Sequence, residues 1–296
     1  MKKPVFTGAG IAIITPMNPD GSMNLPGLGR LIDDQIAHGT DAIVICGTTG
    51  ESAALSPKEH VECIRYAIEK VAKRVPVIAG TGSNDTAFAV SISREAEELG
   101  ADALLLVTPY YNKTSQAGLI AHYTAIANAV HLPCILYNVP SRTGVNIAPA
   151  TLAALCRLPN INAVKEASGN ISQVAEIAAL CGDELNIYSG NDDQIVPLLA
   201  LGGKGVISVL SHVMPKETHD ICALWFAGKV QESLALQLKV LPMCHALFCD
   251  VNPIPVKWAM NVLGWQAGPC RLPLVEPGAA QQQLIRTELQ KAGLLK

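Results

Sequence analysis

The feature that most constrains the fold is a series of eight short apolar runs, each followed by glycine or polar residues. The first run begins at Gly10 and the last at Gly205, so seven intervals span 195 residues, about 28 residues each. The runs are continuously apolar rather than alternating, which is typical of strands that are covered on both faces in a parallel sheet. They comprise residues 10–16, 41–47, 75–82, 101–109, 132–140, 161–168, 185–192 and 205–211.

Segments of helical length lie between these runs. Residues 57–73 place Val61 and Ile64 on one apolar stripe and offer Ser56 as the N-cap, and residues 86–99 and 116–130 have similar spacing. Eight strand–helix units at this interval predict a closed (β/α)8 barrel. An open doubly wound sheet is the alternative that the pattern leaves open.

The last quarter of the chain shows helical patterns without further strands. These patterns cover residues 215–227, 229–248, 253–263 and 279–292. We therefore divide the chain into a barrel core of residues 1–214 and a C-terminal helical region of residues 215–296 that packs on the barrel.

The composition excludes several classes of protein. Hydrophobic residues make up 49% of the chain and charged residues 16%, so the chain is expected to collapse into a core rather than stay disordered. A net charge of −3 and only 4% aromatic residues argue against nucleic-acid binding. No run of 18 uninterrupted apolar residues occurs, so we expect no membrane span.

Nine cysteines are scattered along the chain, mostly in apolar runs, and none forms a Cys-x-x-Cys motif. This pattern predicts free, buried thiols and a reducing compartment, the cytoplasm. Cys244 and His245, with Cys249, are the closest approach to a metal-ligand cluster, and we interpret them as core residues. We expect no metal site.

Active sites of parallel barrels lie at the carboxyl ends of the strands, so the residues that end each apolar run are the candidate site. The polar ends are Gly47-Thr48-Thr49-Gly50-Glu51, Thr108-Pro109-Tyr110-Tyr111-Asn112, Tyr137 with Arg142, Lys165-Glu166, Ser189-Gly190-Asn191-Asp192 and Ile207-Ser208. Asp192 and Asp193 are interpreted as helix-capping residues. Fingerprints of dinucleotide sites, phosphate-binding loops, nucleophile elbows and zinc proteases are absent.

Lys165 allows two interpretations. As a structural residue it would reach solvent or pair with Glu166. As a nucleophile it would form a Schiff base, which requires a neutral amine and therefore a pKa lowered by burial. The residues alone leave both interpretations open.

Four further side chains support the nucleophile. Tyr137 could relay a proton, Arg142 could hold a carboxylate through two parallel hydrogen bonds, and Thr48 and Thr49 offer hydroxyls between two glycines. Each of them has an ordinary structural role as an alternative: packing for Tyr137, a surface charge for Arg142, a turn for the threonines. Together with the amine they describe a site for a keto acid.

These segments, in this order, resemble the pyruvate-dependent lyase and synthase family of (β/α)8 aldolases. The resemblance rests on Gly47 to Glu51, Tyr110-Tyr111-Asn112, Tyr137 to Gly144 and Lys165-Glu166-Ala167-Ser168-Gly169, and residues 205–209 and 252–257 extend it nearly end to end.

The resemblance implies a reaction and a set of roles. Lys165 would form an imine with pyruvate, and the derived enamine would attack the aldehyde of L-aspartate 4-semialdehyde, a step of lysine (diaminopimelate) biosynthesis. Tyr137 would shuttle protons together with Thr48 and with Tyr111, the latter contributed by a neighbouring subunit.

The resemblance also implies how the substrates are held. Thr49 would bind the pyruvate carboxylate, Arg142 the carboxylate of the semialdehyde, and main-chain groups at Gly190 and Ile207 would complete the pocket. Members of the family are typically homotetramers and use no organic cofactor.

Two other functions stay open. One is an N-acetylneuraminate lyase or sugar-acid aldolase, which shares the imine-forming lysine and the tyrosine; Thr48 and Arg142 argue against it. The other is a barrel that binds keto acids without catalysis, which the complete set of reactive groups disfavours.

Sensitive members of the family are inhibited by lysine at a dimer-interface site. The matching positions here are Ser52, Ala53, His60, Asn84 and Tyr110, and all are compatible with such a site. Phe88, however, stands where sensitive enzymes have a glutamate, and Pro57 where some have a histidine. Since a carboxylate facing the effector's ammonium is lost, we expect weak or no inhibition by lysine.

Overall fold

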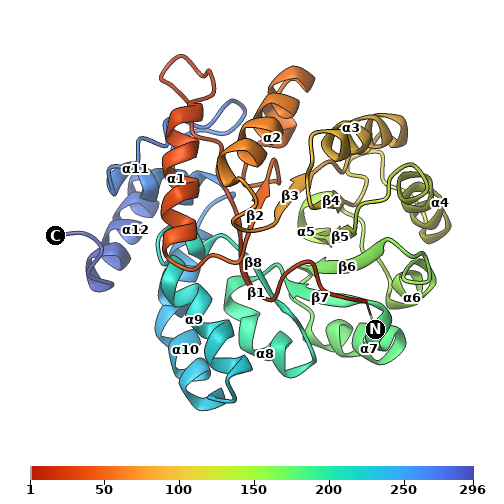
Figure 1. Cartoon of the computed structure of the whole chain (residues 1–296). Helices are drawn as coiled ribbons and strands as arrows, with labels where there is room; N and C mark the ends of the chain where they lie inside the picture. The colour runs from red at the N-terminus through yellow and green to blue at the C-terminus, as the bar shows by residue number, and fades with distance from the viewer. Residues whose placement is uncertain (1) are drawn as a thin grey trace.

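Eight parallel strands close into a barrel in the order β1 to β8, with β8 returning to pair with β1 (Figure 1). The structure is a computed structural model that describes residues 2–296. Its closure confirms the predicted barrel and rules out the open sheet. The strands are β1 (Gly8–Ala12), β2 (Ala42–Ile45), β3 (Val77–Gly80), β4 (Ala103–Val107), β5 (Cys134–Asn138), β6 (Ile161–Glu166), β7 (Asn186–Ser189) and β8 (Gly205–Ser208).

The first strand lies slightly earlier than the apolar run suggests. β1 starts at Gly8 and ends at Ala12, because it pairs with β8 from Gly8 opposite Gly205. A Cβ on Gly205 would lie 1.8 Å from the carbonyl oxygen of Gly8, so only glycine permits the two backbones to approach and close the barrel.

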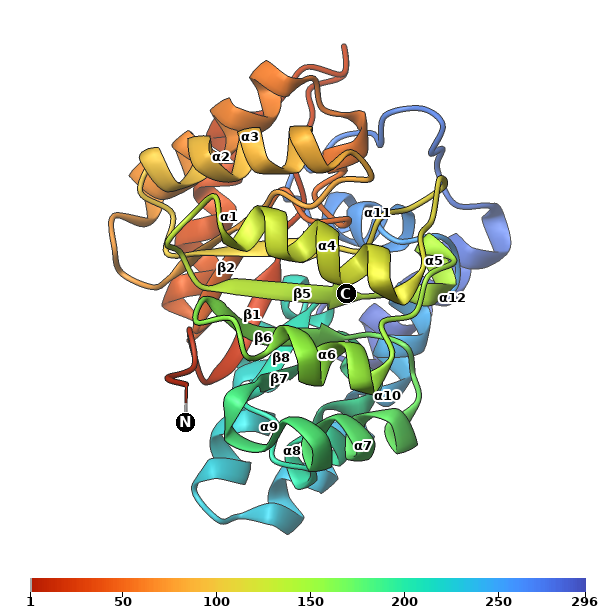
Figure 2. The same cartoon turned by 90° about the vertical axis from the view of Figure 1, so that its right-hand side faces the viewer.

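Helices surround the barrel on its outside (Figures 1 and 2). After the strands come α1 (Leu25–Ala37), α2 (Pro57–Val71), α3 (Thr86–Glu98), α4 (Gln116–Ala127), α5 (Pro140–Thr143), α6 (Pro149–Leu155), α7 (Ile171–Cys181), α8 (Ile195–Ala200) and α9 (Pro215–Phe226). Ser56 caps α2, as its sequence predicts, and the structure adds a reciprocal capping box with Glu59.

Three more helices complete the chain: α10 (Val230–Leu247), α11 (Ile254–Val262) and α12 (Ala279–Lys291). They form one group in which α10 and α11 both contact α12, and α10 also packs on α9. Because α9 contacts β1 as well as α10, it joins this group to the barrel. The division at residues 214 and 215 stays a prediction.

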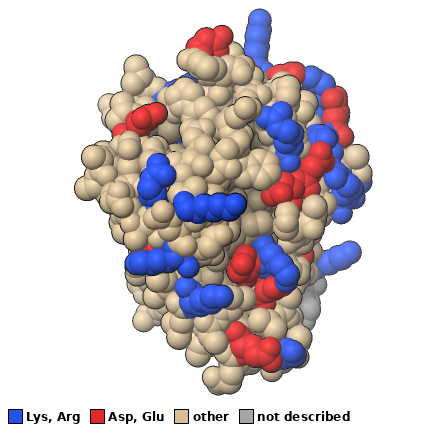
Figure 3. All heavy atoms as spheres, turned by 90° about the vertical axis from the view of Figure 1, so that its left-hand side faces the viewer, with Lys and Arg blue, Asp and Glu red and all other residues tan. Residues whose placement is uncertain are grey.

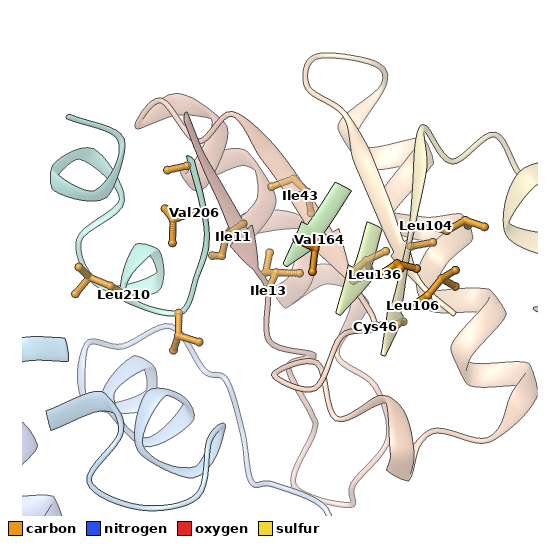
Figure 4. Close-up of a cluster of buried hydrophobic side chains, with 14 of the residues drawn as sticks. Ile11, Ile13, Ile43, Cys46, Leu104, Leu106, Leu136, Val164, Val206 and Leu210 are labelled. Atoms are coloured by element: carbon orange, nitrogen blue, oxygen red, sulfur yellow. The ribbon is translucent and has the colours of Figure 1, made fainter. Parts of the chain in front are cut away.

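Two apolar layers explain why the strand runs are continuously apolar. Leu104 and Leu106 on β4 point outward and pack under the helices (Figure 4). Leu105 between them belongs to the cluster inside the barrel. On β6 the same alternation sends Val164 outward and Ala163 inward. Lys165, two residues after Ala163, is therefore on the inward-facing side of β6.

Aromatic rings fill the amino-terminal end of the barrel. Phe6, just before β1, stacks on Tyr188 of β7 with ring centroids 4.4 Å apart, and the Tyr188 hydroxyl donates to the Phe6 carbonyl at 2.6 Å. Small inward residues such as Ala42 and Ala103 leave room for the rings. The interior is thus packed at this end.

The surface carries charges of both signs. On the face shown in Figure 3, lysines and arginines lie among aspartates and glutamates, and neither sign forms a continuous patch. No helix within residues 2–296 has the length and apolar character needed to cross a membrane.

His212 makes a pH-dependent contact between the segment after β1 and the turn after β8. It lies in the short turn Leu210–His212 after β8, where its Nε2 accepts the N–H of Ile14 (3.0 Å) and its Nδ1 donates to the Val209 carbonyl (2.8 Å). The bond from Ile14 requires the neutral ring, because a protonated Nε2 has no lone pair with which to accept. Burial lowers the pKa of His212 to about 4, from 6.5.

We expect the free energy of unfolding to fall as the pH drops from about 6.5 to about 4. In this range the unfolded chain binds a proton at His212 that the folded chain excludes, which costs on the order of 3 kcal/mol. Urea unfolding of the wild type and of His212→Gln at several pH values measures this pH dependence of the free energy of unfolding. Identical pH slopes for the two proteins would contradict the assignment.

Candidate active site

A cavity of about 420 Å³ opens at the carboxyl end of the barrel. It is bordered by the loop after β2, the β5–α5 segment and two pieces of the C-terminal region, residues 251–253 and 271–274. Thr48 and Arg142 line it, as the sequence predicts. Lys165 and Tyr137 do not line it; they are buried on the neighbouring strands β6 and β5.

Lys165 is 5% exposed and faces the barrel interior. It pairs in register with Tyr137 of β5, and its Nζ lies over the Tyr137 ring, 4.3 Å from the centroid. Among residues 2–296, no carboxylate lies close enough to form an ion pair with it. The structure therefore excludes the surface-lysine interpretation and places an amine beside a phenol.

Glu166 points the other way. Its carboxylate accepts the N–H of Ser168 (2.8 Å), the side-chain amide of Asn138 (2.9 Å) and that of Gln173 (3.3 Å). These bonds lie behind the strand, away from Lys165. A pairing of Lys165 with Glu166, one reading of the sequence, is thus ruled out by the alternation of side chains along β6.

The loop with the two threonines is held in an unusual backbone conformation. Cys46 and Glu51, which flank it, have φ values of 55° and 56°, in the left-handed region that non-glycine residues rarely adopt. Thr48 is half-buried at the cavity, and Thr49 is buried. Such strain persists only where surrounding contacts hold it.

A buried ion pair supplies those contacts. Lys257 of α11 donates to Glu51 Oε1 at 2.6 Å, to the Pro269 carbonyl at 2.6 Å and to the Thr15 carbonyl at 3.2 Å. Glu51 Oε2 accepts the N–H of Arg271 at 2.8 Å. No role was predicted from the sequence for Glu51 or Lys257, although both lie in segments that carry the family resemblance.

Arg142 is carried by the short helix α5 that follows β5. One of its terminal nitrogens donates to the carbonyl of Asn252 at 2.9 Å, and its side chain lines the cavity. Under it, the hydroxyl of Thr108 donates to that of Thr143 at 2.9 Å and anchors α5 to β4. Asn252 was also missed, since it lies 110 residues away in sequence.

Tyr111 is not part of the site of its own chain. Its side chain is 92% exposed and its φ is 68°, a conformation that carries the ring away from the barrel. Tyr110, by contrast, lines the cavity. The structure of one chain thus brings Lys165 and Tyr137 together and places Thr48 at the neighbouring cavity, but leaves Tyr111 exposed.

Gly190 lies next to the Lys165 side chain, and Ile207 is on the inner face of β8. Ile207 belongs to the apolar interior of the barrel. The Gly190 N–H donates to the Glu166 carbonyl at 2.8 Å. A Cβ at position 190 would lie 2.6 Å from the Ala167 Cβ and 3.2 Å from the Lys165 Cε, so the glycine leaves the space that the lysine chain occupies.

Gly190→Ala is expected to lower kcat/KM for any reaction at the Lys165 amine by about 100-fold, because a shift of the amine by an ångström misaligns its attack. The backbone of Gly190 is not in the left-handed region, so the variant should still fold. Gly278→Ala, where only the flexible end of Gln281 is close, is the matched control. Steady-state kinetics measure the loss of activity, and thermal unfolding shows whether the variant is folded. Wild-type kinetics in Gly190→Ala would contradict the inference that a Cβ at position 190 crowds the Lys165 side chain.

Asp192 has a different role from the one its sequence suggests. It is buried, and its Oδ2 accepts the N–H groups of Val209 and Leu210, both at 2.9 Å. It therefore caps the turn after β8 rather than a helix of its own segment, and it links the ends of β7 and β8. Burial raises its pKa, against the effect of these hydrogen bonds and of Lys165.

Four of the five candidate regulatory residues line the same cavity as Thr48: Ser52, Ala53, His60 and Tyr110. Asn84 lines a neighbouring cavity of about 320 Å³ instead. Phe88, 37% exposed, borders the first cavity with its ring. The His60 Nε2 is already hydrogen-bonded to the Gly80 carbonyl at 2.7 Å.

The nine cysteines are free thiols, and seven of them are buried. Burial raises the pKa of Cys244, with nearby Asp192 and Asp193 acting in the same direction. Within residues 2–296 no group of three or more His, Cys, Asp or Glu side chains is arranged to hold a metal ion.

A closed parallel barrel with a buried lysine at the end of β6, beside a tyrosine of β5, defines the class of the lysine-dependent (β/α)8 aldolases. Residues 5–292 match the dihydrodipicolinate synthetase family. The chain belongs to this family, which confirms the resemblance found in its sequence.

Individual relatives agree along the whole chain. A curated protein of Lachnoclostridium phytofermentans named 4-hydroxy-tetrahydrodipicolinate synthase is 57% identical over 292 residues, covering 98% of this chain and 99% of the relative. The solved dihydrodipicolinate synthase of Thermotoga maritima is 40% identical with a TM-score of 0.96, covering 99% and 100%. That of Acinetobacter baumannii, described as chloride-inhibited and complexed with pyruvate, is 42% identical with a TM-score of 0.95, covering 98% and 99%.

Proposed function

We propose that this protein condenses pyruvate with L-aspartate 4-semialdehyde to give 4-hydroxy-tetrahydrodipicolinate, in lysine (diaminopimelate) biosynthesis. The observation that carries the proposal is the buried amine of Lys165, which lies 4.3 Å from the Tyr137 ring centroid and forms no ion pair with any residue from 2 to 296. Membership of the dihydrodipicolinate synthetase family supports the choice of substrates.

The Lys165 amine attacks the keto carbon of pyruvate, and loss of water leaves an imine. Removal of a methyl proton converts the imine into an enamine, whose carbon attacks the aldehyde of the semialdehyde and regenerates an imine. The amino group of the semialdehyde then attacks the imine carbon, which closes the ring and releases the Lys165 amine. Each step moves a proton, and Tyr137 pairs in register with Lys165 and has its ring beside the amine. Thr48, half-buried at the cavity, extends the relay toward solvent.

The two carboxylates are held by different groups. Thr49 binds the pyruvate carboxylate, and the backbone at Gly190 and Ile207 closes the pocket around the imine. Arg142, at the cavity, binds the carboxylate of the semialdehyde through guanidinium donors that its bond to Asn252 leaves free. Only an arginine offers this fork of donors.

The exposed Tyr111 supports an oligomer. A tyrosine that is 92% exposed in a left-handed backbone conformation has no role in its own chain that explains the strain. We assign it to the neighbouring site, so that Tyr111 of the partner subunit completes the relay in a homotetramer built from two dimers. The nine free thiols support work in the cytoplasm.

The test follows pyruvate consumption by the purified protein with L-aspartate 4-semialdehyde and, in parallel, with N-acetylmannosamine. Turnover confined to the semialdehyde supports the synthase. Turnover confined to the sugar would place the protein with the N-acetylneuraminate lyases and leave Arg142 without its assigned carboxylate. If neither aldehyde reacts while pyruvate still binds, the keto-acid-binding barrel becomes the better description.

We expect weak or absent inhibition by lysine. Phe88 presents an apolar ring at the cavity that Ser52 and His60 border, so the effector's ammonium finds no carboxylate from this position. Initial rates at rising lysine concentration check it, with Phe88→Glu as the variant expected to gain sensitivity. Half-maximal inhibition of the wild type by submillimolar lysine would refute the expectation.

A further inference from the structure

Asn252 connects the two residues assigned to the substrate carboxylates. It lies between α10 and α11, is 6% exposed, and lines the cavity. Its side-chain Nδ2 donates to Thr49 Oγ1 at 2.9 Å, and its backbone carbonyl accepts from Arg142 at 2.9 Å. One residue of the C-terminal region thus contacts groups carried by the loop after β2 and by α5.

The direction of the bond to Thr49 has a chemical consequence. A threonine hydroxyl has one hydrogen to donate and lone pairs to accept with. Because the Asn252 amide donates to the Thr49 oxygen, the hydroxyl hydrogen is free for another acceptor. An anion such as a carboxylate is the acceptor that gains most from it.

The other end of the amide argues against a purely structural role. Asn252 Oδ1 is buried and has no hydrogen-bond partner within residues 2–296. A buried acceptor without a partner is destabilising, so an apolar residue of similar size would serve stability better. The hydrogen bond to Thr49 is the interaction that an apolar residue at this position could not make.

A second tether keeps Asn252 in place. Lys257, about one helical turn further along, is bonded to Glu51, two residues after Thr49 in the same loop. The start of α11 and the threonine loop are therefore joined at two points, one of them a buried ion pair. This leaves little freedom for the Asn252 amide to drift from the Thr49 hydroxyl.

We propose that Asn252 is a positioning residue that orients the Thr49 hydroxyl as a donor to the carboxylate of the bound keto acid. The proposal rests on the function proposed above. It extends that function by making pyruvate affinity depend on a side chain outside the barrel strands and their loops.

The test measures imine formation alone, as borohydride trapping of labelled pyruvate on the protein without any aldehyde. We expect Asn252→Ala to raise the half-saturating pyruvate concentration at least tenfold. Asn252→Asp, of the same size, should raise it further, since its carboxylate would take the Thr49 hydrogen and repel pyruvate. Asn261→Ala, which loses two hydrogen bonds elsewhere in this region, should leave it unchanged.

A double-mutant cycle with Thr49→Val tests the route. If Asn252 acts through Thr49, adding Asn252→Ala to Thr49→Val should weaken pyruvate binding by less than twofold more. The proposal would be overturned if the effects of Asn252→Ala and Thr49→Val on the half-saturating pyruvate concentration multiply in the double variant. It would also be overturned if Asn252→Asp binds pyruvate better than Asn252→Ala. Thermal unfolding confirms that each variant is folded.

Failure of the proposed function looks different in the same experiment. If the wild-type chain traps no pyruvate at any concentration, the imine itself is refuted. If the wild type traps pyruvate and Asn252→Ala does so with unchanged concentration dependence, the function stands and the role of Asn252 is wrong.

Discussion

Replacing Lys165 with alanine is expected to abolish borohydride trapping of pyruvate and to lower its turnover by at least about 10,000-fold. The Lys165 amine is the group that we assign to bond covalently to the keto carbon, and alanine offers no nucleophile in its place. Mass spectrometry of the trapped adduct and steady-state rates measure the two effects. The inward position of Lys165 on β6 means that truncation leaves a small cavity rather than an exposed defect.

Tyr137→Phe is the control that separates the covalent step from proton transfer. It keeps the ring under the Lys165 Nζ but removes the hydroxyl. We expect a loss of about 100- to 10,000-fold in turnover, the range for a general acid–base, while the imine still forms slowly.

Trapping of pyruvate by Lys165→Ala at the wild-type level would show that another nucleophile does the chemistry.

Lys257→Met should lower the free energy of unfolding by about 3–5 kcal/mol, because it leaves the Glu51 carboxylate buried without its cation. Lys257 is 2% exposed and Glu51 1%, so neither charge can be rehydrated by a small movement. Since Glu51 ends the threonine loop, the variant should also weaken pyruvate binding. Denaturant unfolding and trapping at several pyruvate concentrations check both effects.

The matched comparison is the double variant Lys257→Met with Glu51→Gln, which removes both charges. We expect it to be more stable than Lys257→Met alone, since the penalty comes from the unpaired charge rather than from the missing bond. If the double variant loses as much unfolding free energy as Lys257→Met and Glu51→Gln lose in sum, the penalty does not come from an unpaired charge and lost packing explains it instead.

The barrel could be predicted because its signal is repeated. Each of the eight runs is apolar on both faces, and Leu104, Leu105 and Leu106 show why: alternate residues enter the layer outside the barrel and the layer within it. The exact start of β1 could not be read in this way, because it depends on where β8 pairs across the closure.

The strand ends supplied most of the candidate site. Lys165, Tyr137 and Thr48 could be found from sequence because the carboxyl ends of parallel strands meet at one end of the barrel. Asn252 and Lys257 could not, since they come from the α10–α11 connection and from α11, whose place over the barrel no local pattern specifies. Their contacts with Thr49 and Glu51 join residues 203 and 206 positions apart.

The sequence by itself determined the eight strand–helix units and the chemistry available at the strand ends, because these follow from local periodicity and from the geometry of parallel strands. Closure of the sheet into a barrel, rather than an open sheet, was decided by the pairing of β8 with β1. Only the tertiary structure decided that Lys165 faces inward without an ion pair, that Glu166 turns away, and that Asn252 bonds to Thr49. The physical reason is that burial and pairing of polar groups depend on which distant segment fills the space beside them. That choice is made by packing of the whole chain.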